Sequence, residues 1–76
     1  MSSAVGLMGV VTIRVPGGDH PGQVRLRDSH GVLENYLAYA TGPLPVATEV
    51  LVTNQRGPLT VDVQTWTLGY VAPEES

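Results

Sequence analysis

Cysteine is absent from this sequence, and with it the disulfides that often stabilise small domains. The two histidines, His20 and His30, are separated along the chain and form no recognisable metal-binding motif. With 76 residues, the chain buries only about 60% of the surface that its unfolded form exposes. A sheet that closes on itself through backbone hydrogen bonds is therefore the remaining way to stabilise so short a chain.

Lysine is also absent, so the positive charge consists of four arginines against seven acidic residues, and the net charge is −3. This balance disfavours nucleic acid as a partner, because binding to phosphates depends on a basic surface. No apolar run approaches the roughly 18 residues of a membrane span, and residues 1–3 lack the start of a signal peptide. We expect a soluble, cytoplasmic chain that reaches a membrane only through a partner or as part of a longer protein.

Uninterrupted stretches are short, because nine glycines and six prolines divide the chain, and the longest stretch without either is 46–56. Long helices are thereby excluded. Valine and threonine dominate the remaining stretches, and their branched side chains favour strands. The alternation of apolar and polar residues predicts five strands, at residues 7–15, 23–27, 32–41, 49–54 and 59–63.

The expected faces of these strands follow from the same alternation. In the first strand Val11, Ile13 and Val15 share the apolar face. In the third strand Tyr36, Ala38 and Ala40 share one face, while Leu37 and Tyr39 share the other, and a bulge near Glu34 and Asn35 would explain the irregular phase. In the fifth strand Leu59, Val61 and Val63 share the apolar face.

Short turns between five strands predict an all-β fold, a five-stranded OB-like closed barrel. Pro43 and Pro45 exclude the helix that OB-folds usually place between strands three and four. The predicted organisation is a flexible N-terminal segment over residues 1–5, the barrel over residues 6–71 and a flexible acidic tail over residues 72–76.

Glycine and proline motifs recur along the chain in a recognisable order and spacing. They are Gly6-Leu7-Met8-Gly9, Pro16 with Gly22-Gln23-Val24, Tyr36-Leu37-Ala38, Gly42-Pro43-Leu44-Pro45-Val46-Ala47-Thr48-Glu49-Val50 and Gly57-Pro58-Leu59-Thr60-Val61. This series resembles the soluble C-terminal domain of NfeD-like proteins. Two features depart from that family, in which the position of Ala47 is usually glycine and the stretch matching Trp66 to Val71 is less apolar.

The resemblance implies a barrel that lacks the helix, is usually attached to transmembrane segments, and is encoded beside stomatin/prohibitin-like membrane scaffold proteins. Longer members of the family carry a serine protease domain upstream, which this sequence does not contain. The predicted function is a non-enzymatic protein-interaction module that docks onto such a scaffold or onto copies of itself. The alternative is a single-stranded nucleic-acid-binding OB domain, which rests on architecture alone.

Two short sequences invite a chemical reading. Asp28-Ser29-His30 contains the residue types of a catalytic triad, but neighbours within one turn rarely form the relay of nucleophile, base and orienting acid. Asp19 and His20 are possible metal ligands, but both residue types are common in turns rich in glycine and proline. We expect no catalytic residue, no cofactor and no metal.

Arg14, Arg25 and Arg27 are expected on outward faces, where they would form a basic stripe toward an acidic partner or anionic lipid headgroups. The alternative is a solvated face on which Glu34 or Asp62 pairs with them.

The strongest candidate for a partner interface is a set of apolar residues, some on the outward face of strand three and the others in the stretch that follows strand five. With Val10, it would form an exposed patch of the kind that marks interfaces. Alternatively, the residues after strand five plug the barrel end that the absent helix leaves open, and the sequence does not decide between the two. The interface residues are Leu37, Tyr39, Trp66, Leu68 and Tyr70.

Overall fold

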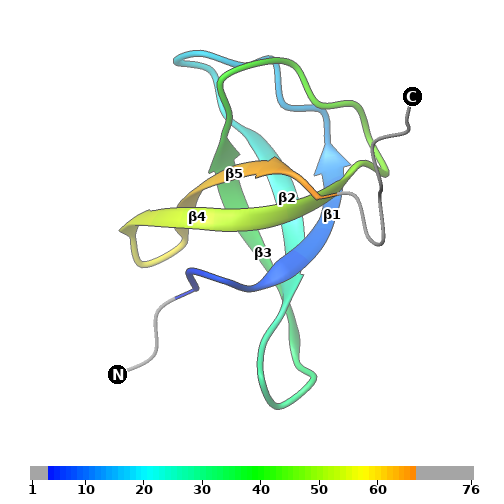
Figure 1. Cartoon of the computed structure of the whole chain (residues 1–76), viewed down its shortest axis with the longest axis vertical. Coiled ribbons are helices and arrows are strands. Elements are labelled where there is room, and N and C mark those ends of the chain that lie inside the picture. The colour runs from blue at the N-terminus through cyan, green and yellow to red at the C-terminus, as the bar shows by residue number, and fades with distance from the viewer. Residues whose placement is uncertain (1–3, 67–76) are drawn as a thin grey trace, which may run out of the picture.

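Five strands pair edge to edge until the sheet closes on itself (Figure 1). The computed structural model describes residues 4–66, and in that range all regular structure is β. No helix in this part of the chain is long and apolar enough to cross a membrane. The strands pair in the closed order β1-β2-β3-β5-β4. Their bounds are Met8–Ile13 (β1), Gly22–Arg27 (β2), Leu33–Tyr39 (β3), Glu49–Gly57 (β4) and Thr60–Thr65 (β5).

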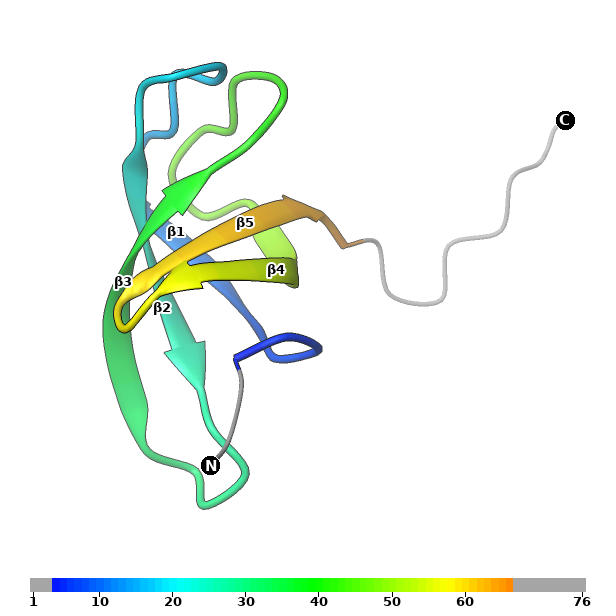
Figure 2. The ribbon, with the colours of Figure 1, turned by 90° about the vertical axis from the view of Figure 1, so that its left-hand side faces the viewer.

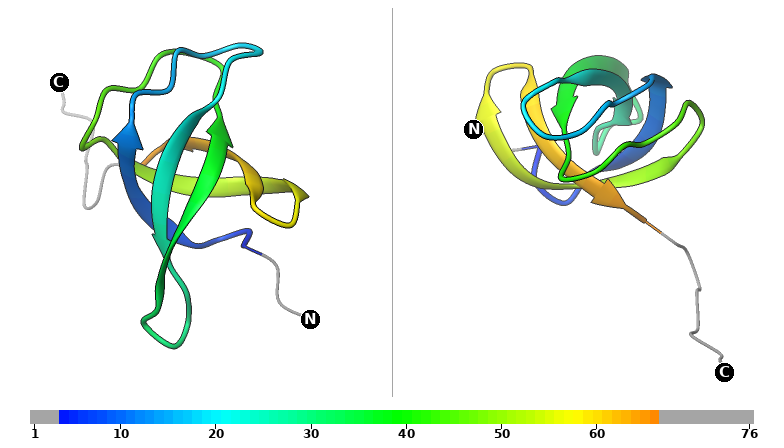
Figure 3. Two further views of the ribbon diagram at one scale, coloured as in Figure 1. Left: turned by 180° about the vertical axis from the view of Figure 1, so that it is seen from behind. Right: turned by 90° about the horizontal axis from the view of Figure 1, so that it is seen from above.

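The order of the strands confirms the predicted five-stranded OB-like barrel. All neighbouring pairs are antiparallel except β3 and β5, which run parallel where Leu37–Tyr39 meets Thr60–Asp62. The β4–β5 hairpin lies across β1, β2 and β3, as Figure 2 shows. Seen from behind and from above, the strands enclose a single interior (Figure 3).

The interior consists almost entirely of valine and other small aliphatic side chains, as the alternation predicts. Tyr36 and Ala40 pack against this core from its margin, which confirms the predicted inward face of β3. The fully or nearly buried core residues are Ala4, Val11, Val15, Val24, Leu26, Ala38, Leu44, Val50, Val52, Val61 and Val63.

Both ends of the barrel are closed by chain that has no regular secondary structure. At one end the turns 14–21 and 40–48 lie together, and Val15 and Leu44 exchange backbone hydrogen bonds of 2.9 and 2.8 Å. At the other end the Ala4 amide donates to Oε1 of Gln55 at 2.7 Å, and Ala4 is only 4% exposed. Leu44 takes the place of the missing helix. Ala4 belongs to the core rather than to the flexible segment in which the sequence placed it.

Two details of strand geometry differ from the sequence-based expectation. β3 pairs with β2 without interruption from Leu33 to Ala38, so the prediction of a bulge near Glu34 and Asn35 was wrong. The register instead shifts within β1, between Val11 and Ile13, and twice within β4. The shift in β1 turns Ile13 outward, where it is 57% exposed, rather than into the core. Leu59, at the turn before β5, is also exposed.

Glycines allow β1 and β2 to approach each other closely where the barrel bends. A Cβ added at Gly9 would lie 2.0 Å from the carbonyl oxygen of Arg25, and one at Gly22 would lie 2.4 Å from that of Arg14. Both neighbours are backbone atoms, so they cannot move aside as a flexible side chain would. These two positions require glycine because of space and not because of their φ angles.

Ala47 adopts a left-handed backbone conformation with φ of 78° in the turn before β4. It is the position at which the resembling family usually carries glycine. The turn is fixed on both sides, because the Ala47 amide donates to the carbonyl of Val11 at 2.8 Å and the Val11 amide donates to that of Thr48 at 3.0 Å. The geometry is therefore maintained at the cost of strain at an L-residue.

Replacing Gly9 by alanine should destabilise the barrel by about 1–3 kcal/mol, as overpacking against fixed neighbours does. The matched control is Gly57→Ala, since a Cβ at Gly57 meets nothing within 4 Å. Urea unfolding followed by circular dichroism measures both variants. Equal stability of the two would contradict the close approach.

Ala47→Gly should stabilise the protein by about 0.5–1 kcal/mol, because relief of left-handed strain exceeds the entropic cost of the added glycine. Ala47→Val should have the opposite effect, since a branched side chain tolerates this conformation least. Thermal unfolding midpoints of the three proteins provide the comparison. A lower midpoint for Ala47→Gly than for the native chain would show that the turn is not strained.

Candidate functional site

An open groove of about 610 Å³ lies on the outer face of the barrel, across β1, β2 and the start of β3. It forms because Val11, Val24 and Leu26 point into the core, so the alternate side chains of β1 and β2 point outward. We call it the Trp66 groove. The side chains that give it its character are Met8, Val10, Arg25, Arg27, Leu33 and Trp66.

Strand register interleaves apolar and charged side chains in this groove. Val10 lies opposite Arg25 on one side and opposite Glu49 on the other. Arg27 lies opposite Leu33. Cross-strand neighbours of this kind have Cβ atoms about 4.5–5.5 Å apart, so each guanidinium borders an apolar side chain. The groove thus offers apolar contact and two guanidiniums, and the carboxylates of Asp28 and Glu49 also line it.

The arginines of the groove are available for an external partner. Arg25 makes only a long hydrogen bond, 3.5 Å from Nε to Oδ1 of Asn35, and neither Arg25 nor Arg27 forms an ion pair with any residue from 4 to 66. The predicted alternative, in which Glu34 or Asp62 neutralises the stripe, is not found in that range. Arg14 does not line the groove, so only two of the three expected arginines come together there.

Trp66 lies at the β4 side of the groove and is not a member of the core cluster. Its backbone amide donates to the carbonyl of Glu49 at 2.9 Å, which fixes the chain beside the first residue of β4. Leu44 and Ala4 are buried at the two ends of the barrel, whereas Trp66 is only partly buried. The alternative in which Trp66, Leu68 and Tyr70 plug the barrel stays a prediction, because Leu68 and Tyr70 lie outside the described residues.

The expected interface residues on β3 face outward, but they lie apart from the Trp66 groove. Leu37 is exposed opposite Gln23 and Thr60. Tyr39 is covered by a guanidinium, that of Arg56, whose Cζ lies 4.1 Å from the ring centroid. The structure therefore joins Val10 with Trp66, as expected, but does not bring Leu37 and Tyr39 into the same depression.

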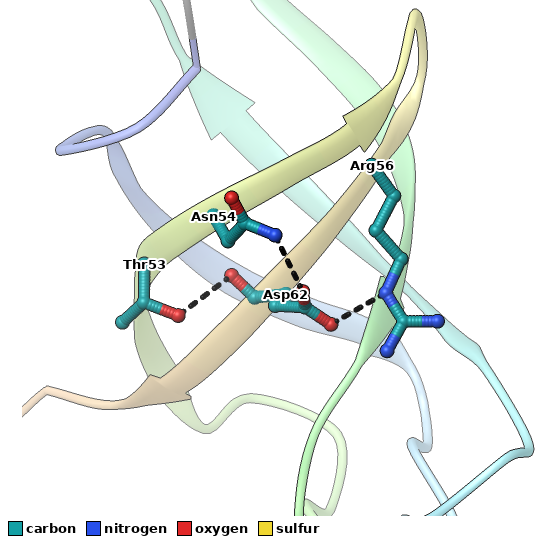
Figure 4. A network of polar contacts seen from close by, with 4 residues as sticks. All are labelled: Thr53, Asn54, Arg56 and Asp62. Atoms are coloured by element: carbon teal, nitrogen blue, oxygen red, sulfur yellow. Dashed lines mark hydrogen bonds and ion pairs between the residues drawn. The ribbon is translucent and has the colours of Figure 1, made fainter.

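Arg56 belongs to a polar network centred on the carboxylate of Asp62 (Figure 4). Nε of Arg56 lies 2.8 Å from Oδ1, and Nδ2 of Asn54 donates to Oδ2 at 3.2 Å. Thr53 donates its hydroxyl to the Asp62 carbonyl at 3.3 Å. The register shifts in β4 break the regular alternation of its side chains and so allow Thr53, Asn54 and Arg56 all to reach Asp62. Because its donors belong to β4, this network fixes the β4–β5 hairpin.

Asp28, Ser29 and His30 form the turn between β2 and β3. Oδ1 of Asp28 accepts hydrogen bonds from the amides of His30 at 2.8 Å and Val32 at 2.9 Å. The bond from Val32, followed by that from His30, lowers the pKa of the Asp28 carboxyl below its ordinary value of 3.8. Asp28 thus stabilises the turn by an Asx-type arrangement, which accounts for its position beside Ser29 and His30.

The second sequence with possible metal ligands also forms a turn. The His20 amide donates to the carbonyl of Gly17 at 3.2 Å, which places Asp19 at an exposed tip. Among residues 4–66, no cluster of three or more histidine, aspartate or glutamate side chains could hold a metal ion.

Sequence reasoning missed Met8 and Leu33 as members of the groove. Met8 lies between two glycines at the beginning of the first strand, and a turn separates Leu33 from the arginines in sequence. The signal that could have found them is hairpin register, because pairing β2 with β3 through the 28–32 turn sets Leu33 beside Arg27. The shape of the groove also depends on the barrel closing, which no local pattern reports.

The strand order and the outer groove define the class of this molecule as a small OB-type barrel with an open surface site. A family model for the NfeD C-terminal domain matches residues 8–64, so the chain belongs to that family. Searches of the curated proteins and of the solved structures found no match. The match covers all five strands except Thr65 and thus confirms the family that the glycine and proline motifs indicated.

The turn at Asp28 should weaken in acid. Because the folded-state pKa is lowered, the stabilisation is complete above the unfolded pKa and is lost as the pH falls through the folded value. An NMR titration of the Asp28 carboxyl should show the low pKa. Asp28→Asn should remove this part of the acid sensitivity in urea unfolding, and an unchanged pH profile in that variant would contradict the assignment.

Proposed function

We propose that this domain is a non-enzymatic protein-docking module and that the Trp66 groove is its docking surface. The observation that carries the proposal is the coincidence on one face of the barrel of Trp66, exposed Met8 and two arginines that form no ion pair within residues 4–66. Tryptophan and arginine dominate the energetics of protein interfaces, and methionine is enriched in them. Such a surface favours a partner segment that presents apolar and acidic side chains side by side.

The partner we propose is a stomatin/prohibitin-like membrane scaffold protein. Membership of the NfeD family supports this choice, because the family resemblance implies genes that lie beside those of such scaffolds. A second copy of the chain is the competing protein partner. The groove carries Asp28 and Glu49 beside Arg25 and Arg27, so the choice of a scaffold protein over a second copy rests on family membership.

A single-stranded nucleic acid is the competing ligand of another class. It is suggested by the location of Trp66, Arg25 and Arg27, since OB-folds bind single strands with aromatic and basic residues on this face. Among residues 4–66, however, only one aromatic side chain lines the groove, and the net charge of the chain is −3. Fluorescence anisotropy with short oligonucleotides at low salt should show no binding. Salt-sensitive binding that is lost on Arg25→Ala would replace protein docking by nucleic-acid binding.

Leu33→Ser should reduce recovery of the scaffold protein about tenfold, the loss expected when an interface anchor contributing about 1.4 kcal/mol is removed. The chain is cross-linked in membranes of its source organism, and the captured scaffold is identified and quantified by mass spectrometry. Trp66→Ala should have a similar effect.

The matched control is Leu59→Ser, because Leu59 is 47% exposed, close to the 51% of Leu33, but lies outside the groove. Leu37→Ser tests whether the outer face of β3 contributes as the sequence predicted. Circular dichroism confirms that each variant folds. The proposal fails if no stomatin/prohibitin-like protein is captured, or if Leu33→Ser and Leu59→Ser capture it equally.

A further inference from the structure

The Trp66 groove begins where the described chain ends. The bond from the Trp66 amide to the Glu49 carbonyl holds this residue at the β4 side of the groove. The sequence continues with three large apolar residues, Leu68, Tyr70 and Val71, followed by Glu74 and Glu75. The segment 67–76 thus carries apolar residues close to Trp66 and negative charges farther away.

The groove offers apolar side chains and two guanidiniums to such a segment, beside the carboxylates of Asp28 and Glu49. Its apolar side chains are exposed, with Met8 at 48% and Leu33 at 51%. Its two guanidiniums, those of Arg25 and Arg27, have no ion-pair partner among residues 4–66. An occupant that combines large apolar side chains with carboxylates would cover the first group and pair with the second.

The distances allow the segment to reach across the groove. From β4 to β3, the groove crosses three strand spacings, about 15 Å in total. The eight residues from Trp66 to Glu74 span up to about 26 Å when extended. The chain can therefore cross β1 and β2 with length to spare.

We propose that residues 67–76 bind the Trp66 groove of their own chain, with Leu68, Tyr70 and Val71 against Met8, Val10 and Leu33. Glu74 and Glu75 then pair with Arg25 and Arg27. Covalent connection makes the local concentration of the segment on the order of millimolar, so even weak contacts suffice for occupancy. A partner that binds the groove would have to displace the segment, and this last consequence rests on the proposed function.

The test uses the purified full-length chain without any partner, so its result is independent of scaffold binding. Trp66 is the only tryptophan and reports directly on the groove. The double variant Leu68→Ser with Tyr70→Ser should shift its emission to longer wavelength and increase its quenching by acrylamide. Amide exchange in residues 67–76 should become about tenfold faster in this variant. Ala72→Ser, which leaves the large apolar residues in place, is the control.

A charge exchange separates specific docking from general collapse. Arg25→Glu with Arg27→Glu should accelerate amide exchange in residues 67–76, and adding Glu74→Arg with Glu75→Arg should restore protection. Arg14→Glu, a change of the same kind outside the groove, should have no effect. Amide exchange at random-coil rates in residues 67–76 of the native chain would overturn the proposal. Protection that grows with protein concentration would overturn it as well, because the occupant would then be the tail of a second copy.

Discussion

The structure depends on the pairing that closes the sheet. β1 meets β4 over only three residue pairs, and β3 meets β5 over three more. Without these two short strand pairings the sheet would have free edges. A chain without disulfides has no covalent cross-link to compensate for the lost stability. The buried valines depend on the same closure, because an open sheet of this length would leave one of its apolar faces in water. Gly9 and Gly22 permit the close approach of strands that closure requires.

Closure also determines the outer surface. Once the valine faces point inward, register alone sets the neighbours on the outside, so Val10 lies between Arg25 and Glu49. The β4–β5 hairpin is fixed separately, by the Asp62 network. The groove and this network therefore occupy different parts of the barrel wall. Among residues 4–66, the arginines of the groove have no ionic partner, whereas Arg56 in the network pairs with Asp62.

Much of the fold could be predicted from the sequence, since the alternation in Val24–Leu26 and Val61–Val63 reports the core directly. The roles of Ile13, Leu44 and Ala4 could not, because they depend on a register shift and on contacts between segments far apart in the chain. For the site, the sequence correctly placed Arg25 and Arg27 on the outer face. It grouped Val10 and Trp66 with Leu37 and Tyr39 because local alternation gives the face of a residue but not its position around a barrel.

The place of β5 in the sheet has a consequence for how the chain folds. The last strand in sequence lies between β3 and β4, and the contact from Ala4 to Gln55 spans 51 residues. Such a high contact order is typical of domains that fold in milliseconds to seconds, after local hairpins have formed. During synthesis, neither β3 nor β4 can obtain its second neighbour until Thr65 has left the ribosome. The nascent chain thus displays two open strand edges until β5 has emerged, the stage at which a chaperone would protect it best.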